Sequence, residues 1–262
     1  MKWGASFLVS KIETRDTWRD FISFARRHEF GHLEFLFEHP YSFCTVKRPF
    51  EKELKRETSG FSLSIHAPFK YNDLTAPCKP IREASLVEAK AAVDYAARLD
   101  AEFVVVHVGH NTIYSRENYR QLLGNCPARL FDYAYSRGMQ LLVENIPARF
   151  EFDRGFPATP QEFRELENIL ERKVGVCFDP PHAMASGLDV YACARSLAPR
   201  IVEVHLQDGS RTSEHLALGK GEIDFKRLFH SLGEFDGAMT LELFRISDLE
   251  ASLARLGELG LR

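Results

Sequence analysis

Eight short apolar runs, separated by longer amphipathic stretches, recur along this chain from one end to the other. They are rich in Val, Ile, Leu and Phe and lack polar alternation, which is typical of strands buried on both faces of a parallel sheet. The runs are Trp3–Val9, Leu33–Phe37, Ser62–His66, Phe103–His107, Gln140–Glu144, Val174–Phe178, Ile201–His205 and Met239–Leu243. Their recurrence predicts a chain of alternating strands and helices.

The stretches between these runs have the periodicity of helices. In the clearest one, Leu86, Ala89 and Val93 recur at helical spacing with charged residues between them. Thr159 followed by Pro160 predicts a helix start, because Thr caps a helix and Pro suits its first position. The predicted helices are Thr17–His28, Pro49–Glu57, Ile81–Leu99, Arg116–Arg137, Thr159–Glu171, Val190–Leu197, Asp224–Leu232 and Ser247–Leu259.

Eight strand–helix units in 262 residues match the size of an α/β TIM barrel, a single (β/α)8 domain that we expect to span residues 1–262. A doubly wound open sheet is the alternative. It would favour a glycine-rich phosphate-binding turn after the first strand, and Ser10–Glu13 contains no glycine.

Composition narrows the functional classes. The formal net charge is −3, which gives no overall attraction to nucleic acid or to an anionic membrane. The five cysteines are scattered and form no CxxC motif, which indicates a reduced, cytoplasmic protein. We find no signal peptide and no apolar stretch near the ~18 residues that a membrane span needs, so no membrane partner is expected.

Six successive predicted strands end in potential metal ligands. In a TIM barrel, the carboxyl ends of the strands form the active-site face. The residues at or just beyond these ends are His66, His107, Glu144, Asp179, His205 and Glu242. Two further histidines follow in the loops, His182 three residues after Asp179 and His215 after the seventh strand.

Each of these residues alone has an ordinary structural explanation. A histidine at a strand end is commonly a hydrogen-bonded core or loop residue, an aspartate before proline often caps a helix, and Glu242 could face outward. Together they predict a metal site, because burying so many ionisable groups at one barrel mouth is costly without an ion to pair them. His32 and His110 are expected to be solvent-exposed or loop histidines.

The predicted ligands divide into groups by strand. Glu144, Asp179, His205 and Glu242 form an oxygen-rich four-residue group that suits Zn²⁺, Mn²⁺, Mg²⁺ or Co²⁺. His66 and His107 can join Glu144 in a three-residue group that holds a second ion, which gives one or two ions per chain. His182 and His215 face either the substrate or a third ion.

Seven short motifs carry a resemblance to a known family. They are SIHAPF, VVHVG, LLVENIP, GVCFDPPHA, VHLQDG, EHLALGKGEIDF and LELF. In this order and at strand ends, they resemble the xylose isomerase-like TIM barrel superfamily, which groups sugar and sugar-phosphate isomerases and epimerases with the endonuclease IV (AP endonuclease 2) family.

The resemblance implies roles at matching positions. In the isomerase branch, the four-residue group binds one ion and its two glutamates move a proton between adjacent carbons. In the endonuclease branch, the three-residue and four-residue groups each hold a zinc. The counterparts of His182 and His215 share a third zinc with an aspartate, and Ser213 occupies that position here. A third ion is therefore in doubt unless Glu214 turns inward.

Three functions remain open on the sequence. The first is isomerisation or epimerisation of a sugar or sugar phosphate, with Glu144 and Glu242 transferring the proton and His182 orienting a hydroxyl. Lys220 or Arg245 could bind a phosphate or carboxylate, although a solvated surface charge is the favoured explanation for both, because surface Lys and Arg are common. The second is phosphodiester hydrolysis by two metals, on DNA or on a small phosphodiester. The third is a non-catalytic binding barrel. A monomer and a homodimer are both compatible with the sequence.

Overall fold

Eight parallel strands close into a barrel in the computed structural model, which describes residues 1–8, 17–36, 38, 48–111, 116–148 and 154–262. The order around the barrel is β1-β10-β9-β8-β6-β4-β3-β2. The barrel strands are β1 (Lys2–Leu8), β2 (His32–Leu36), β3 (Ser62–His66), β4 (Phe103–Val106), β6 (Gln140–Glu144), β8 (Gly175–Phe178), β9 (Ile201–Leu206) and β10 (Ala238–Leu243). The chain is thus a single (β/α)8 TIM barrel.

The eight predicted strands each correspond to one barrel strand, with bounds that agree or differ by one residue at either end. Val9 and Phe37 lie outside the described residues. The sequence did not predict β5 (Gly109–Asn111) and β7 (Arg154–Phe156), which pair antiparallel in a separate small sheet. These strands extend the loops that follow β4 and β6, and each is too short to show periodicity.

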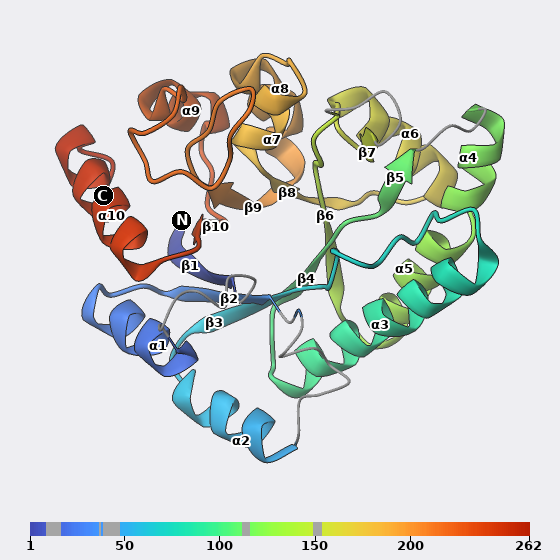
Figure 1. The fold of residues 1–262 in the computed structure, drawn as a ribbon, viewed down its shortest axis with the longest axis horizontal. Helices are drawn as coiled ribbons and strands as arrows, with labels where there is room; N and C mark the ends of the chain where they lie inside the picture. Colours follow the sequence, from blue (N-terminus) through green and yellow to red (C-terminus); the bar gives the residue numbers. More distant parts are fainter. Residues whose placement is uncertain (9–16, 37, 39–47, 112–115, 149–153) are drawn as a thin grey trace.

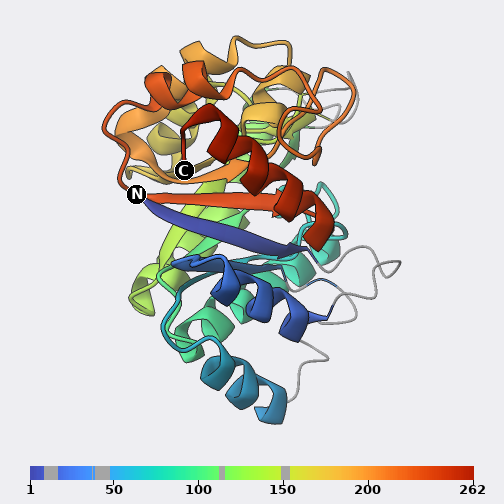
Figure 2. The same ribbon diagram turned by 90° about the vertical axis from the view of Figure 1, so that its left-hand side faces the viewer.

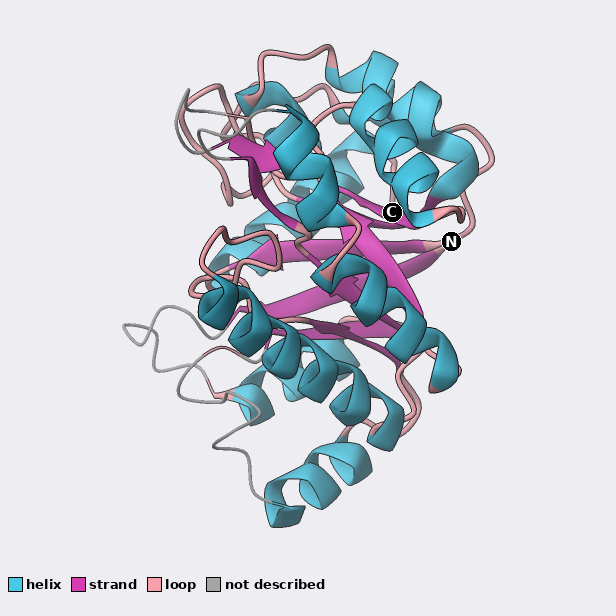
Figure 3. Cartoon of the chain, turned by 90° about the vertical axis from the view of Figure 1, so that its right-hand side faces the viewer, coloured by secondary structure: helices cyan, strands magenta, loops and turns pink. Residues whose placement is uncertain are grey.

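Helices surround the strands, as Figures 1 and 3 show. Their bounds are α1 (Trp18–Arg27), α2 (Arg48–Glu57), α3 (Lys79–Arg98), α4 (Arg116–Leu123), α5 (Cys126–Ser136), α6 (Pro160–Leu170), α7 (Pro180–Ala185), α8 (Val190–Leu197), η1 (Ala198–Arg200), α9 (Phe225–Leu232) and α10 (Ile246–Leu259). The start of α6 is as predicted, since the Thr159 hydroxyl accepts from the Glu162 N–H at 3.1 Å.

Two helix predictions differ from the structure. The single predicted helix Arg116–Arg137 is wrong, because α4 ends at Leu123 and α5 begins at Cys126. Asn125 between them has φ −105° and ψ −99°, outside the helical region, and Pro127 lies in the first turn of α5. The short helix α7, which follows Asp179, was not predicted.

The barrel interior contains both apolar and polar side chains. Apolar side chains from β4, β6, β8 and β10 pack together, namely Phe103, Val105, Leu142, Cys177 and Ala238. Fully buried polar residues from β2, β3, β9 and β10 lie against them, and the His32 ring stacks 5.6 Å from that of Phe103. These polar residues are His32, Glu34, Ser64, Glu203, His205 and Thr240. Because buried polar groups require partners, they form a network of hydrogen bonds and ion pairs.

His32 belongs to this interior network, so its assignment as a solvent-exposed or loop histidine is wrong. Its Nδ1 and Nε2 lie 2.8 Å and 3.0 Å from the hydroxyls of Ser62 and Ser64, and Nε2 is 3.4 Å from Glu203 Oε1. His110 lies in β5 and is partly buried. An inward position on a strand, set by the period of two, is enough to bury a polar residue here.

The two ends of the chain meet at the amino-terminal end of the barrel, where Figure 2 shows the N and C markers close together. The Arg262 guanidinium lies 5.4 Å from the centre of the Trp3 ring in β1. The candidate site lies at the opposite end of the barrel, at the carboxyl ends of the strands. None of the described helices is long and apolar enough to cross a membrane.

Candidate metal centre

The four-residue group converges at the carboxyl ends of its strands. Glu144 ends β6, Asp179 follows β8, His205 lies in β9 and Glu242 lies in β10. Each offers one ligand atom, and these atoms all lie within 4.8 Å of one another. All four side chains are buried. The parallel barrel therefore brings together residues that are far apart in the chain, as the strand-end pattern predicted.

The predicted three-residue group also forms. His66 Nε2 and His107 Nε2 lie 3.0 Å and 2.9 Å from the same oxygen, Glu144 Oε2. The Phe69 ring covers both imidazoles, with ring centres 5.3 Å from His66 and 4.6 Å from His107. The Phe69 N–H donates to Glu38 Oε1 at 2.6 Å, which fixes the loop that carries the ring.

His205 provides a direct test of whether an ion fits the four-residue group. Its Nδ1 is buried and has no hydrogen-bond partner within the described part of the chain. This atom lies 3.4 Å from both Glu144 Oε1 and Glu242 Oε2. A buried imidazole nitrogen facing carboxylates is the donor set that divalent ions of the Zn²⁺ or Mn²⁺ type prefer. The residues therefore fit a divalent metal ion.

Asp179 combines two roles that the sequence left as alternatives. Its Oδ1 accepts from the His182 N–H at 2.7 Å and so caps α7, while Oδ2 faces Gln207. The Gln207 side-chain amide also donates to Glu242 Oε2 at 2.8 Å. Sequence analysis missed Gln207, although its position two residues after His205 puts it on the same inward side. Gln207 thus links two members of the four-residue group.

Burial and neighbouring charges shift the carboxylates in different directions. Burial raises the pKa of Glu242 to about 8 and that of Asp179 to about 6. Burial also acts on Glu144, but His107 and His205 outweigh it and hold the pKa of Glu144 well below its usual range. Without an ion, the shared residue Glu144 is the anion around which the histidines gather.

The two histidines of the three-residue group differ in charge. Burial lowers the pKa of both rings. For His66 the Glu144 carboxylate outweighs burial and raises the pKa to about 9, whereas the pKa of His107 falls to about 4. His66 is therefore a doubly protonated imidazolium at neutral pH. Its extra proton must leave before His66 can bind an ion.

The two loop histidines lie at the edge of the centre. His182 Nδ1 is 2.9 Å from the Asn145 carbonyl oxygen and 3.1 Å from Glu144 Oε1. Its Nε2 lies 3.4 Å from Glu214 Oε2, so Glu214 does turn inward, whereas Ser213 is exposed. His215 Nδ1 lies 3.7 Å from Glu242 Oε2. These residues adjoin the two groups but do not cluster as tightly, and the third compact group among the described residues is Cys177, Glu203 and His205.

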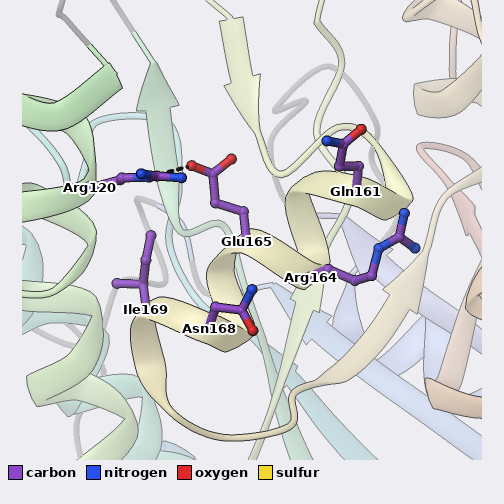
Figure 4. Close-up of a pocket in the computed structure, with 6 residues that line it drawn as sticks. All are labelled: Arg120, Gln161, Arg164, Glu165, Asn168 and Ile169. Atoms are coloured by element: carbon purple, nitrogen blue, oxygen red, sulfur yellow. Dashed lines mark hydrogen bonds and ion pairs between the residues drawn. The ribbon is translucent and has the colours of Figure 1, made fainter.

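Lys220 and Arg245, the two residues predicted to bind an anion, lie on the surface rather than among the buried candidate ligands. Lys220 lies in the loop after β9 and Arg245 precedes α10, and both are exposed. A second hollow, outside the barrel between α4 and α6, is shown in Figure 4. It is lined by Arg120, Gln161, Arg164, Glu165, Asn168 and Ile169. Its lining contains none of the predicted ligands, so the barrel mouth remains the candidate site.

Glu34 is a candidate functional residue that was not predicted from the sequence. It is fully buried in the middle of β2, and its carboxylate contacts His205 Nε2 at 3.2 Å. The signal was present, because a glutamate inside the apolar run Leu33–Phe37 is unusual. Its inward position is shared with His32, two residues earlier, which marks this strand as polar on its inner side.

Comparisons with known proteins agree with the barrel fold. Two solved structures align over nearly the whole chain. A D-tagatose 3-epimerase-like protein has TM-score 0.79 and 24% identity, with 98% of this chain and 96% of that chain covered. The TTHB071 protein from Thermus thermophilus, from a crystal soaked with ZnCl₂, has TM-score 0.77 and 25% identity, with 99% and 98% covered.

A curated relative and a family model also match this chain. A probable endonuclease 4 from Campylobacter concisus is 30% identical, and the alignment covers 60% of this chain and 60% of that protein. The family model described as "Xylose isomerase-like TIM barrel" matches residues 22–259, nearly the whole chain. This protein therefore belongs to the xylose isomerase-like TIM barrel family.

Proposed function

We propose that this protein is a divalent-metal-dependent isomerase or epimerase that acts on a sugar or sugar phosphate. The observation that carries the proposal is the four-residue group, in which two glutamates flank one buried histidine nitrogen at 3.4 Å each. Proton transfer between adjacent carbons needs an acid and a base on either side of a polarised substrate, and this pair supplies both. The epimerase-like neighbour of the same fold is consistent with this chemistry.

A bound divalent ion would polarise the substrate carbonyl and so acidify the neighbouring C–H bond. One glutamate of the pair takes the proton from that carbon, and the other delivers a proton to the opposite face or to the adjacent carbon. Burial, which raises the pKa of Glu242 to about 8, puts this residue in the range where a carboxyl group gives and takes protons at neutral pH.

The surrounding residues provide substrate contacts. His182 Nδ1 is held by the Asn145 carbonyl oxygen and Nε2 faces Glu214, so a substrate hydroxyl would bind His182 by displacing the Glu214 carboxylate from Nε2. His215 lies partly exposed next to Glu242. The proposed partner is a small carbohydrate. Because Lys220 and Arg245 are exposed, any phosphate they bind would lie at the outer edge of the mouth.

The test follows hydrogen exchange. Manganese-loaded protein is incubated in D₂O with a panel of ketoses and ketose phosphates, and deuterium at the carbon next to the carbonyl is measured by NMR. We expect exchange with at least one sugar, and Glu242→Gln is expected to lower its rate by about 10²–10⁴-fold, as for loss of a general acid–base group. Metal content is measured alongside, to separate proton transfer from ion binding.

The matched control is Glu250→Gln, which changes an exposed glutamate in α10. It should exchange deuterium at the wild-type rate. An absence of deuterium in every sugar of the panel, in protein that retains its ion, would contradict the isomerase proposal. Unchanged exchange in Glu242→Gln would instead remove this residue from the proton transfer.

The second candidate function is metal-dependent phosphodiester hydrolysis, and the three-residue group favours it. His66 and His107 converge on Glu144, which the four-residue group also uses, so two neighbouring ions would share one carboxylate. Proton transfer at a single ion does not require this second group, whereas hydrolysis by two ions does. Hydrolysis of a simple phosphodiester such as bis-p-nitrophenyl phosphate tests this candidate directly.

A further inference from the structure

Glu34 stands behind His205, on the side of the imidazole away from the other ligands. We propose that Glu34 is a positioning residue that holds the proton of His205 on Nε2 and so presents Nδ1 to the metal ion. The inference rests on the metal site of the proposed function, but its tests need no substrate. It adds to that site a residue which belongs to neither ligand group.

The contacts between these residues are specific. His205 Nε2 lies 3.2 Å from Glu34 Oε1 and 3.3 Å from Glu34 Oε2, so both carboxylate oxygens face one ring nitrogen. Both side chains have no exposed surface. The residues come from β2 and β9, which are not adjacent in the barrel, so the contact crosses the interior.

The chemistry of imidazole makes this contact directional. A ring whose Nδ1 binds an ion keeps one proton, on Nε2, and the Glu34 carboxylate, which accepts but cannot donate, stabilises that proton there. The lone pair then lies on Nδ1, which faces Glu144 and Glu242 and has no hydrogen-bond partner among the described residues. A carboxylate behind a ligating histidine fixes the ring and makes it a better ligand.

A second buried histidine–glutamate pair shows that the arrangement is not simply how this barrel buries polar groups. In the pair of His32 and Glu203, both ring nitrogens of His32 lie within hydrogen-bond distance of hydroxyls, those of Ser62 and Ser64. Glu203 also accepts from the Thr240 hydroxyl. Both nitrogens of His32 are therefore occupied, although Glu203 Oε2 has no hydrogen-bond partner among the described residues, whereas His205 has one nitrogen directed at the four-residue group.

The experiment compares the full-length wild type with Glu34→Gln and Glu34→Ala. Zinc dissociation constants are measured by competition with a chromophoric chelator. We expect both variants to bind the ion of the four-residue group about 10–100-fold more weakly, the usual effect of removing a partner behind a ligand. Nitrogen-15 NMR of the zinc-loaded wild type should show the His205 proton on Nε2, and Glu34→Ala should lose this protected proton signal.

Glu203→Gln is the matched control, because it removes another fully buried carboxylate that lies close to His205 but accepts from the Thr240 hydroxyl. It should retain the wild-type dissociation constant. Unchanged zinc affinity in both Glu34 variants would overturn the inference, as would an equal loss in Glu203→Gln or a His205 proton found on Nδ1. If Glu34→Ala does not fold, Glu34→Gln decides. A protein that binds zinc as expected but isomerises no sugar leaves this inference intact and contradicts only the proposed function.

Discussion

The three-residue and four-residue groups share Glu144 but differ in composition and surroundings. The three-residue group has two imidazoles and one carboxylate, and the Phe69 ring lies against both imidazoles. The four-residue group has three carboxylates and one imidazole, with Gln207 and Glu34 bonded to its members. Nitrogen-rich sites favour Zn²⁺, whereas oxygen-rich sites also accept Mn²⁺ and Mg²⁺.

This difference separates the two candidate reactions. The four-residue group contains everything that proton transfer requires, namely one ion site and two glutamates. The three-residue group adds an ion site but no further acid or base beyond Glu144. The three-residue group would therefore contribute only to a reaction that uses a second ion, such as hydrolysis by two ions. Changes confined to one group will show which reaction the barrel performs.

The largest effect is expected from Glu144→Gln, because this residue belongs to both groups. An amide is a poor ligand and cannot take a proton, so we expect affinity at both sites to fall by more than about 100-fold, above the usual cost of losing a partner behind a ligand. Isomerase and phosphodiesterase activities should both disappear. Metal content after dialysis and thermal unfolding measure the effect, with Glu203→Gln as the buried control. Full metal content and activity in Glu144→Gln would refute both mechanisms.

A smaller and more selective effect is expected from the double variant His66→Ala plus His107→Ala. Both rings contact only the three-residue side of Glu144, at Oε2, so the ion of the four-residue group should remain. The isomerase proposal predicts one ion fewer per chain and deuterium exchange within about threefold of wild type, since no proton-transfer group is lost. If the double variant lost both deuterium exchange and phosphodiester hydrolysis, the two-ion mechanism would replace the isomerase proposal.

The strand pattern and the clustering of the candidate ligands were predictable from the sequence for one physical reason. Parallel strands buried on both faces are uninterrupted apolar runs, so a charged residue at the end of such a run is conspicuous. Residues such as Glu144 and Asp179 are of this kind. Once the runs are assigned to one barrel, their ends must meet, and the clustering follows from topology alone.

Residues inside the barrel were much harder to predict. Glu34, His32 and Glu203 are buried because they occupy inward positions, and inward and outward positions look alike in a run that is buried on both sides. The inner side becomes visible only when the register of neighbouring strands is known, as where Glu34 lies level with Ser64. The break between α4 and α5 was not predicted, because the amphipathic pattern of Arg116–Arg137 continues across Asn125 and so looks like one helix.

A change of affinity with pH is also expected, because the three-residue group must lose a proton before it binds an ion. In the metal-free protein the Glu144 carboxylate outweighs burial and raises the pKa of His66 to about 9. Below that pH an ion entering the three-residue group must displace the His66 proton. Its apparent affinity should therefore rise about tenfold per pH unit from pH 7 toward pH 9, and this contribution should then level off.

The matched variant is His66→Ala, which retains His107 and has no proton to displace at position 66. The zinc affinity of the three-residue group is measured by chelator competition at pH 7, 8 and 9. It should rise less steeply with pH in this variant than in the wild type, because one proton fewer is released per ion. The pKa of His107 is about 4, so that ring contributes nothing over this range. Equal slopes in the two proteins would mean that the proton resides elsewhere, and the charge assignment within the three-residue group would be wrong. A steeper slope in the wild type would identify His66 as the residue that gives up its proton when the second ion binds.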